Sequence, residues 1–226
     1  MKLLKSGKTK DVYELGNGQL LLGFKDEGTV DEDGNFDPGG NKTGVTVKGM
    51  GEANLRLSSY FFEKIKAAGI PSHFISADFE KGTMTVKPAS FFGKGLEHIC
   101  RFKAAGSFIR RFGMYAQEGQ DLPAIIEITV KDDERGDPLI TAECLIALDI
   151  MTIQEHVELV SLTTQIANLV KDELAAKGTV LYDIKLEFGR SNGEIILIDE
   201  IAGGSMRVYK NGALMSPLEI AGLMLS

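Results

Sequence analysis

Charged and apolar residues alternate through the segment 181–189 of this chain. In an extended strand, successive side chains point to opposite faces. One face then carries Asp183, Lys185 and Glu187, and the other carries Tyr182, Ile184, Leu186 and Phe188. Carboxylate oxygens on a rigid strand are hard ligands of the kind that Mg²⁺ prefers. The charged face therefore has the chemistry of a magnesium site, although a solvated strand face shows the same spacing.

A hairpin is predicted directly after this strand. Ser191-Asn192-Gly193 is typical of a turn, and 194–201 has the pattern of a returning strand. A three-residue loop would place Asp199 opposite Lys185 and add a third carboxylate to the charged face. A two-residue loop would turn Asp199 toward the apolar side, where an unpaired carboxylate costs on the order of several kcal/mol. We therefore expect the three-residue loop.

Two further segments have features of anion sites. Ser6-Gly7-Lys8-Thr9-Lys10 forms a turn that enters a strand, where glycine allows close approach of a phosphate and the alternate lysines share one face. Arg101 follows the strand 96–100, and Ser107 stands where a helix begins, so a guanidinium fork and a helix N-terminus could receive a phosphate or carboxylate. Surface Gly-Lys turns and N-cap serines show the same patterns, so both interpretations stay open.

Other polar residues carry less information. Lys131 and Asp137 bracket a polar turn after an apolar strand, and Arg207 follows the flexible pair Gly203-Gly204. The three histidines are scattered, which argues against a histidine metal cluster or a nucleophile triad. Walker A, Rossmann and Gly-x-Ser-x-Gly patterns are absent from the sequence.

Composition limits the class of protein. With 226 residues, 43% of them hydrophobic, the chain can bury a substantial core. A net charge of −7 argues against a nucleic-acid partner, whose binding protein would be basic. The sequence has no signal peptide and no apolar run of about 18 residues, so we expect a cytoplasmic protein with no membrane span. Cys100 and Cys144 fit no zinc spacing and are predicted to be buried thiols.

The order of the elements predicts an α+β fold. Short strands and turns fill the first ninety residues, with a long mobile loop expected over 27–50 and an amphipathic helix over 54–68. Thr152 and Glu155 form a capping box at the head of the longest helix, which should run to about Lys177. Its predicted core stripe is Val157, Val160, Leu169, Val170 and Leu174. Most hairpins should be antiparallel, which excludes a doubly wound sheet.

Read together, these segments resemble the phosphoribosylaminoimidazole-succinocarboxamide synthase (SAICAR synthetase) family as a divergent member. The resemblance is carried by motifs in the family's order across nearly the whole chain. They are Gly7-Lys8-Thr9-Lys10-Asp11-Val12-Tyr13, Phe24-Lys25-Asp26, Ala68-Gly69-Ile70-Pro71, Ala104-Ala105-Gly106-Ser107, Lys131-Asp132-Asp133, Gly136-Asp137-Pro138, the segment 183–189, and Asp199-Glu200.

The resemblance implies a two-lobed fold. An antiparallel β-rich lobe (1–90) would bind nucleotide, an α/β lobe (91–226) would carry the metal and substrate sites, and ATP would lie in a cleft between them. It also implies an ATP-dependent ligase that forms SAICAR from carboxyaminoimidazole ribotide and L-aspartate through an acyl phosphate in de novo purine biosynthesis. The expected partners are therefore small molecules, and a homodimer is left open.

The resemblance also implies roles for particular residues. ATP would contact Lys8, Lys10 and Lys87. Mg²⁺ would be held by Glu187 and Asp199, with Asp183 and Lys185 beside them as catalytic residues. The substrates would be bound by Arg101, Ser107, Arg207, Lys131 and Asp137.

The chain departs from the family pattern in its last third. Where the family has Ser-Pro-Asp, this sequence reads Ala202-Gly203-Gly204, and where it has Arg-Leu-Trp-Asp, this sequence reads Arg207-Val208-Tyr209-Lys210. The chain also ends at Ser226, roughly a helix earlier than typical members. These departures leave two alternatives open: a ligase for another amine or carboxylate, or a non-catalytic nucleotide-binding relative.

Overall fold

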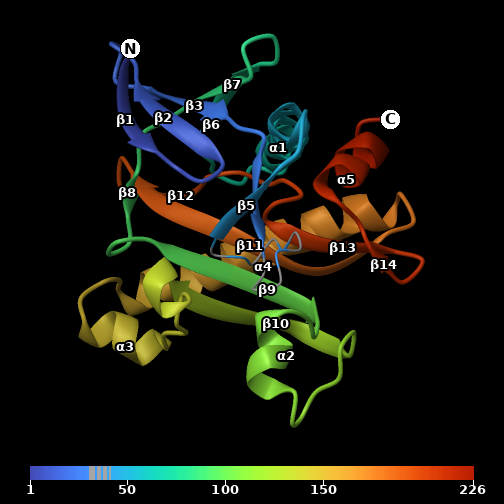
Figure 1. Ribbon diagram of the computed structural model, residues 1–226. Helices are drawn as coiled ribbons and strands as arrows, with labels where there is room; N and C mark the ends of the chain where they lie inside the picture. Colours follow the sequence, from blue (N-terminus) through green and yellow to red (C-terminus); the bar gives the residue numbers. More distant parts are fainter. Residues whose placement is uncertain (31–33, 35–36, 38–39, 41) are drawn as a thin grey trace.

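Two large antiparallel sheets and a smaller two-stranded sheet, together with the helices that pack on them, make up the described part of the protein (Figure 1). The computed structural model describes residues 1–30, 34, 37, 40 and 42–226. The first sheet has the order β1 (Lys2–Ser6), β2 (Lys10–Glu14), β3 (Leu20–Phe24), β7 (Thr83–Val86) and β6 (Phe74–Asp78). Helix α1 (Met50–Ala67) packs beside this sheet. The α+β class predicted from the element order is confirmed.

The second sheet is larger and contains the segment with alternating charges. Its order is β10 (Asp121–Val130), β9 (Leu96–Lys103), β11 (Val180–Ser191), β13 (Met206–Lys210) and β14 (Ala213–Leu214). Two further strands, β8 (Ser90–Phe91) and β12 (Glu194–Ile198), pair with β11. The remaining helical segments are α2 (Ser107–Phe112), η1 (Asp133–Arg135), α3 (Ala142–Ala147), α4 (Ile153–Ala175) and α5 (Pro217–Met224).

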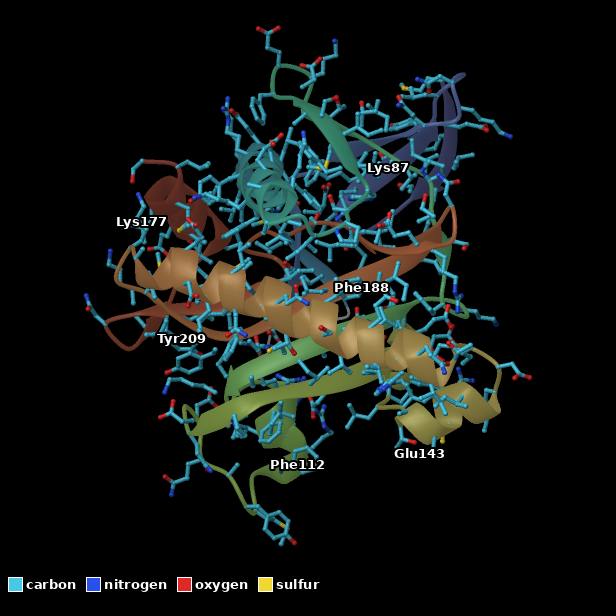
Figure 2. All side chains as sticks on the ribbon, turned by 180° about the vertical axis from the view of Figure 1, so that it is seen from behind. Lys87, Phe112, Glu143, Lys177, Phe188 and Tyr209 are labelled. Carbon is cyan, nitrogen blue, oxygen red and sulfur yellow. The ribbon has the colours of Figure 1, made fainter. Side chains whose placement is uncertain are left out.

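Helix α4 covers the apolar face of the second sheet (Figure 2). It begins at the predicted capping box, where Thr152 Oγ1 accepts from the Glu155 amide and the Glu155 carboxylate accepts from the Thr152 amide. The predicted core stripe was only partly right, because Val157 is 63% exposed. The buried positions of the helix are Leu159, Leu162, Thr163, Ile166, Ala167, Val170 and Leu174.

Helix α1 begins four residues earlier than predicted. Its N-terminus is capped from a distance, because the two carboxylate oxygens of Asp26 accept from the amides of Gly49 and Gly51. Those amides have no partner inside the helix, so the aspartate satisfies them in place of a local cap. A capping residue more than twenty positions away leaves no mark in a local sequence pattern.

The segment 27–50 was predicted to be a loop, and this was wrong at both ends. Strands β4 (Glu27–Val30) and β5 (Lys42–Thr46) pair as a two-stranded sheet. The predicted mobility of the part between them falls largely outside the described residues. Of the two cysteines, Cys100 is buried as predicted, with its thiol pKa raised to about 12 by burial, whereas Cys144 is exposed.

The two sheets share one hydrophobic core and are also connected through the backbone. Residues from α1, the first sheet, α4 and the second sheet belong to the same cluster of buried side chains. Leu197 of β12 accepts from the His73 amide at 2.9 Å and donates to the Pro71 carbonyl at 3.0 Å. Among the described helices, none combines the length and apolar character that a membrane span requires.

Candidate functional site

Polar side chains gather on the face of the second sheet that α4 leaves uncovered. Register sets their neighbours: Asp183 of β11 lies opposite Arg101 of β9 and Arg207 of β13. Further along β11, Glu187 lies opposite Glu97. Strand alternation then extends the charged face predicted for β11 across its neighbours. Its members are Glu97, Arg101, Glu127, Thr129, Asp183, Lys185, Glu187 and Arg207.

An arginine cluster forms one end of this face. Nη1 of Arg101 and Nη1 of Arg207 both donate to Asp183 Oδ2, at 2.7 and 2.8 Å. Arg101 also donates to Glu127 at 2.6 Å and to the Ser107 hydroxyl at 2.9 Å, and it is only 1% exposed. The structure thus brings together three of the predicted substrate-site residues, with Ser107 the outermost partner of Arg101.

Arg207 is confined between two other segments. Gly106 has φ 55° and ψ −127°, and a Cβ at that position would lie 2.5 Å from Arg207 Nη2. On another side, Nη2 of Arg207 donates to Asp37 Oδ1 at 2.5 Å. Burial opposes the charge of Arg207, but Asp183 and Asp37 outweigh it and raise the pKa.

A lysine–carboxylate group forms the other end of the face. Lys185 donates to Glu97 at 2.8 Å, and Lys131 donates to Glu187 at 2.5 Å. Burial, followed by the negative charge of Asp199, raises the Glu187 pKa to about 7. The two predicted metal ligands are therefore close enough for the charge of Asp199 to affect the pKa of Glu187.

Asp199 joins this group from the end of β12. Its carboxylate lies 2.9 Å from Lys10 Nζ of β2, and Glu200 pairs with the same ammonium. Asp199 has φ 67°, and its carbonyl accepts from His73 Nε2 at 2.9 Å. Burial lowers the His73 pKa to about 4, so the imidazole is neutral near pH 7. Its role here is a hydrogen bond to the backbone of Asp199, not an ion pair.

The predicted register of this hairpin was wrong, although Asp199 still reaches the charged group. Ser191 pairs with Glu194, so the loop has two residues, and the ladder ends with Ile198 opposite Glu187. Strand alternation therefore does not set the direction of Asp199. The left-handed backbone after Ile198 turns the carboxylate toward Lys10.

Tyr182 also departs from the predicted alternation. A β-bulge interrupts the β11–β13 pairing between Leu181 and Asp183, so Leu181 joins Ile184 in the core. Tyr182 instead stacks on Tyr209, with ring centroids 3.8 Å apart. The other three predicted apolar positions, Ile184, Leu186 and Phe188, are buried as expected.

The remaining predicted residues lie around the group. Lys8 Nζ lies 2.7 Å from Asp133, and both side chains are well exposed. Lys87 donates to the Ser72 carbonyl at 3.3 Å. Asp137 accepts from the Asp132 amide at 2.7 Å, and burial raises its pKa. Asp137 is close enough to Glu97 and Lys185 for their charges to act on its pKa, whereas the contacts given above for Lys8 and Lys87 are to Asp133 and Ser72.

Several charged residues of the site were not assigned from the sequence. Glu97 and Glu127 stand at alternate positions on β9 and β10, so the same alternation argument applied to those strands would have found them. Arg111 of α2 holds both oxygens of Glu127 at 2.7 Å and so steadies the partner of Arg101. His73 carried no local signal at all, because its partner is the backbone of Asp199.

The carboxylate oxygens of Glu187 and Asp199 suit a hard divalent cation whose remaining coordination positions are filled by a bound substrate. Among the described residues, no three His, Cys, Asp or Glu side chains form a group able to hold a metal alone. The buried carboxylate of Glu187 and the partly exposed carboxylate of Asp199 act on each other's pKa, and they match the usual Mg²⁺ arrangement, in which substrate phosphates complete a site of one or two carboxylates.

A sheet face that presents paired lysines, arginines and carboxylates defines a class of protein: an α+β protein with a charged candidate site on its larger sheet. Comparison with known proteins makes this specific. The family model described as SAICAR synthetase matches residues 3–217. A phosphoribosylaminoimidazole-succinocarboxamide synthase from Clostridium tetani is 53% identical over 227 residues, covering 100% of both chains. The chain belongs to the SAICAR synthetase family.

Solved structures agree with this assignment. A phosphoribosylaminoimidazole-succinocarboxamide synthase from Ehrlichia chaffeensis superposes with a TM-score of 0.83 at 27% identity, covering 94% of this chain and 88% of that one. A SAICAR synthetase in complex with ADP superposes with a TM-score of 0.84 at 29% identity, covering 96% and 93%. The alternatives of another ligase or a non-catalytic relative are not favoured by these matches.

The departure at Ala202-Gly203-Gly204 has a packing consequence. A Cβ on Gly203 would lie 2.5 Å from Cα of Pro217, the first residue of α5. Any side chain at 203, including the family's proline, would therefore displace α5 from this position. At Gly204 a Cβ would lie 3.9 Å from Glu200 Oε1, so the glycine leaves Glu200 without a neighbouring carboxylate there.

Proposed function

We propose that this chain is an ATP-dependent ligase of purine biosynthesis that joins carboxyaminoimidazole ribotide to L-aspartate and releases SAICAR, ADP and phosphate. The observation that carries the proposal is the charged face of the second sheet. Asp199, next to this face, forms an ion pair with Lys10 of the first sheet. Cations that would bind phosphates lie beside carboxylates that would hold a metal, and this supports the proposal. Membership of the SAICAR synthetase family supplies the reaction.

ATP is assigned to the junction between the two sheets, which would divide the chain into a nucleotide lobe (1–90) and a substrate lobe (91–226). Lys8 and Lys10 lie on the turn and strand that enter the first sheet and would bind the phosphates, and Lys87 would be a further contact to the nucleotide. Glu187 and Asp199 would hold Mg²⁺, which supplies charge neutralisation of the transferred phosphoryl group. Lys10 lowers the pKa of Asp199 and keeps that carboxylate ionised before nucleotide arrives, and Lys131 pairs with Glu187.

The ribotide is assigned to the arginine cluster. Arg207 and Ser107 would contact the ribose phosphate, and Arg101 would orient Ser107 as it does in the structure. Lys131 and Asp137 would bind the imidazole side of the substrate. Asp183 fixes both guanidinium groups through one oxygen, so its part is positional.

The proposed reaction has two steps. A ribotide carboxylate oxygen attacks the γ-phosphorus of ATP, forming a C–O–P bond while the bond to ADP breaks. The aspartate amine then attacks the acyl carbon, an amide C–N bond forms, and phosphate leaves with the former carboxylate oxygen. Lys185, paired with Glu97, lies on the strand between the two substrate regions and would neutralise the charge that builds on the acyl group.

A coupled assay tests the proposal. The protein, ATP, Mg²⁺, the ribotide and L-aspartate should release ADP and SAICAR in equal amounts, and omission of any one component should stop both. ATP binding without turnover on aspartate would contradict the assignment. We further propose a cytoplasmic protein whose partners are these small molecules, with a homodimer to be tested by sedimentation.

A further inference from the structure

Asp37 connects a distant segment to the arginine cluster. It lies between β4 and β5 in the sequence, yet its carboxylate pairs with Arg207, and the two side chains are only 13% and 10% exposed. The Asp37 amide donates to the Thr29 carbonyl at 3.0 Å, and the Thr29 hydroxyl donates to the Asp37 carbonyl at 2.7 Å. Asp37 is thus tied to β4, which pairs with β5, and β5 runs toward the large sheet (Figure 1).

The contact occupies the part of Arg207 that an anion needs. A guanidinium binds a phosphate or carboxylate with two parallel hydrogen bonds, using Nη2 together with either Nη1 or Nε. Both of these pairs include Nη2, to which Asp37 is bonded. An anion that took either pair would lie against the Asp37 carboxylate, and like charges at such separations repel strongly.

The charge balance of the cluster leads to the same conclusion. Arg101, Arg111 and Arg207 are paired with Glu127, Asp183 and Asp37. Three positive and three negative side chains leave this cluster neutral while Asp37 is in place. Removing Asp37 leaves the cluster with one net positive charge beside Arg207, whose other carboxylate partner, Asp183, is shared with Arg101.

We propose that Asp37 is an internal competitor for the anionic group of the substrate. It neutralises Arg207 in the free protein, and binding of the ribose phosphate displaces it together with the β4–β5 sheet. This inference rests on the proposed assignment of Arg207 to the ribotide. In this proposal the Asp37 carboxylate and the ribose phosphate compete for the Arg207 guanidinium. Asp37 then lowers the apparent affinity for substrate, because it reduces the fraction of free protein in which Arg207 can bind.

The first test measures affinity for the ribotide, and separately for inorganic phosphate, by calorimetry without ATP. Asp37→Asn preserves shape but removes the competing charge, so it should tighten both ligands about tenfold if the contact is closed in nine of ten free molecules. Asp78→Asn is the matched control, because it makes the same change in a surface pair with Lys81 and should alter neither affinity. Unchanged or weaker binding in Asp37→Asn would overturn the proposal.

A double variant separates this inference from the function on which it rests. Arg207→Gln alone should weaken the ribotide, and Asp37→Asn should add nothing in that background. If Arg207→Gln leaves ribotide affinity intact, the assignment of Arg207 fails. If it weakens binding while Asp37→Asn in the native background gives no gain, only the competitor fails.

A fluorescent reporter tests the predicted movement. The chain contains no tryptophan, so Thr46→Trp at an exposed position of β5 introduces a single fluorophore. Ribotide should shift its emission when Asp37 is present and should cause little further shift in the Asp37→Asn protein, where the sheet is already released. An identical emission change in both proteins would contradict displacement of Asp37.

Discussion

Lys10 Nζ lies 2.9 Å from Asp199 Oδ1, so one ion pair joins β2 of the first sheet to the residue that follows β12 of the second. Glu200 pairs with the same ammonium from the next position. Burial opposes the charge on Lys10, but Asp199 and Glu200 outweigh it and raise the Lys10 pKa. The lysine proposed to bind ATP therefore also holds a proposed metal ligand in place.

Lys10→Ala should be costly in two ways. It leaves Glu200, which is 7% exposed, without its cation, and removal of one partner from a buried pair typically costs about 3 kcal/mol. It should also raise the KM for ATP. Urea unfolding and steady-state kinetics measure both effects. Lys10→Arg keeps the charge and should recover most of the stability, and a loss as large as in the alanine variant would argue against the ion-pair explanation.

Asp199→Asn tests the metal assignment. The change preserves size but removes an anionic oxygen, so Mg²⁺-dependent turnover should fall by roughly 100-fold or more. The fold should be retained, because Glu200 still pairs with Lys10 and the carbonyl that accepts from His73 is unchanged, although losing the ion pair with Lys10 should lower the free energy of unfolding. Activity measured against Mg²⁺ concentration reports the effect on the metal site, and circular dichroism shows whether the variant is folded. Near-normal rates at low Mg²⁺ would remove Asp199 from the metal site.

Gly106→Ala should disturb Arg207 specifically. The added Cβ would lie 2.5 Å from Nη2 and 2.6 Å from Cζ, so the guanidinium must move. We expect the KM for the ribotide to rise about tenfold or more while the KM for ATP stays close to its native value. Gly212→Ala is the matched control, since Gly212 has φ 82° but open space around it. An equal kinetic effect there would mean that backbone strain, rather than Arg207, is responsible.

His98 should make the protein sensitive to acid. Both ring nitrogens are buried without a hydrogen-bond partner among the described residues, and burial lowers the pKa to about 3. In the unfolded chain the imidazole titrates near about 6.5, so between these values the unfolded state binds the extra proton. The free energy of unfolding should therefore fall as pH drops below about 6.5, by up to about 1.4 kcal/mol per unit.

The variant His98→Leu should lower this slope by roughly half, because it removes one of two protons that the unfolded state takes up in this range, the other belonging to buried His73. Urea midpoints at several pH values between 7 and 4.5 measure the slope for both proteins. A native-like slope in the variant would assign the acid sensitivity to other groups. His98 also makes an edge contact with Phe188, so the substitution should change the free energy of unfolding at every pH. The readout is therefore the slope of this free energy against pH, not its absolute value.

Much of the candidate site followed from local patterns. Period-two alternation correctly placed Asp183, Lys185 and Glu187 on one face and Ile184, Leu186 and Phe188 in the core, because strand geometry is imposed residue by residue. The capping box fixed the start of α4 for the same reason: its hydrogen bonds join residues three apart. The ordered motifs then indicated the family, which the comparisons confirm.

Other features depended on contacts between residues distant in the sequence. Asp26 begins α1 early, a bulge opposite β13 moves Tyr182 out of the core, and His73 holds the carbonyl of Asp199. No local pattern encodes these, because each partner belongs to a separate element.

The sequence by itself determined the charges, the strand face that carries them, and the family. Only the tertiary structure decided which lysine or arginine neutralises which carboxylate, including the pairing of Asp37 with Arg207. The physical reason is range. Side-chain direction is set by neighbouring backbone torsions, whereas the partner of a buried charge is whichever opposite charge the packed sheets bring within about 3 Å.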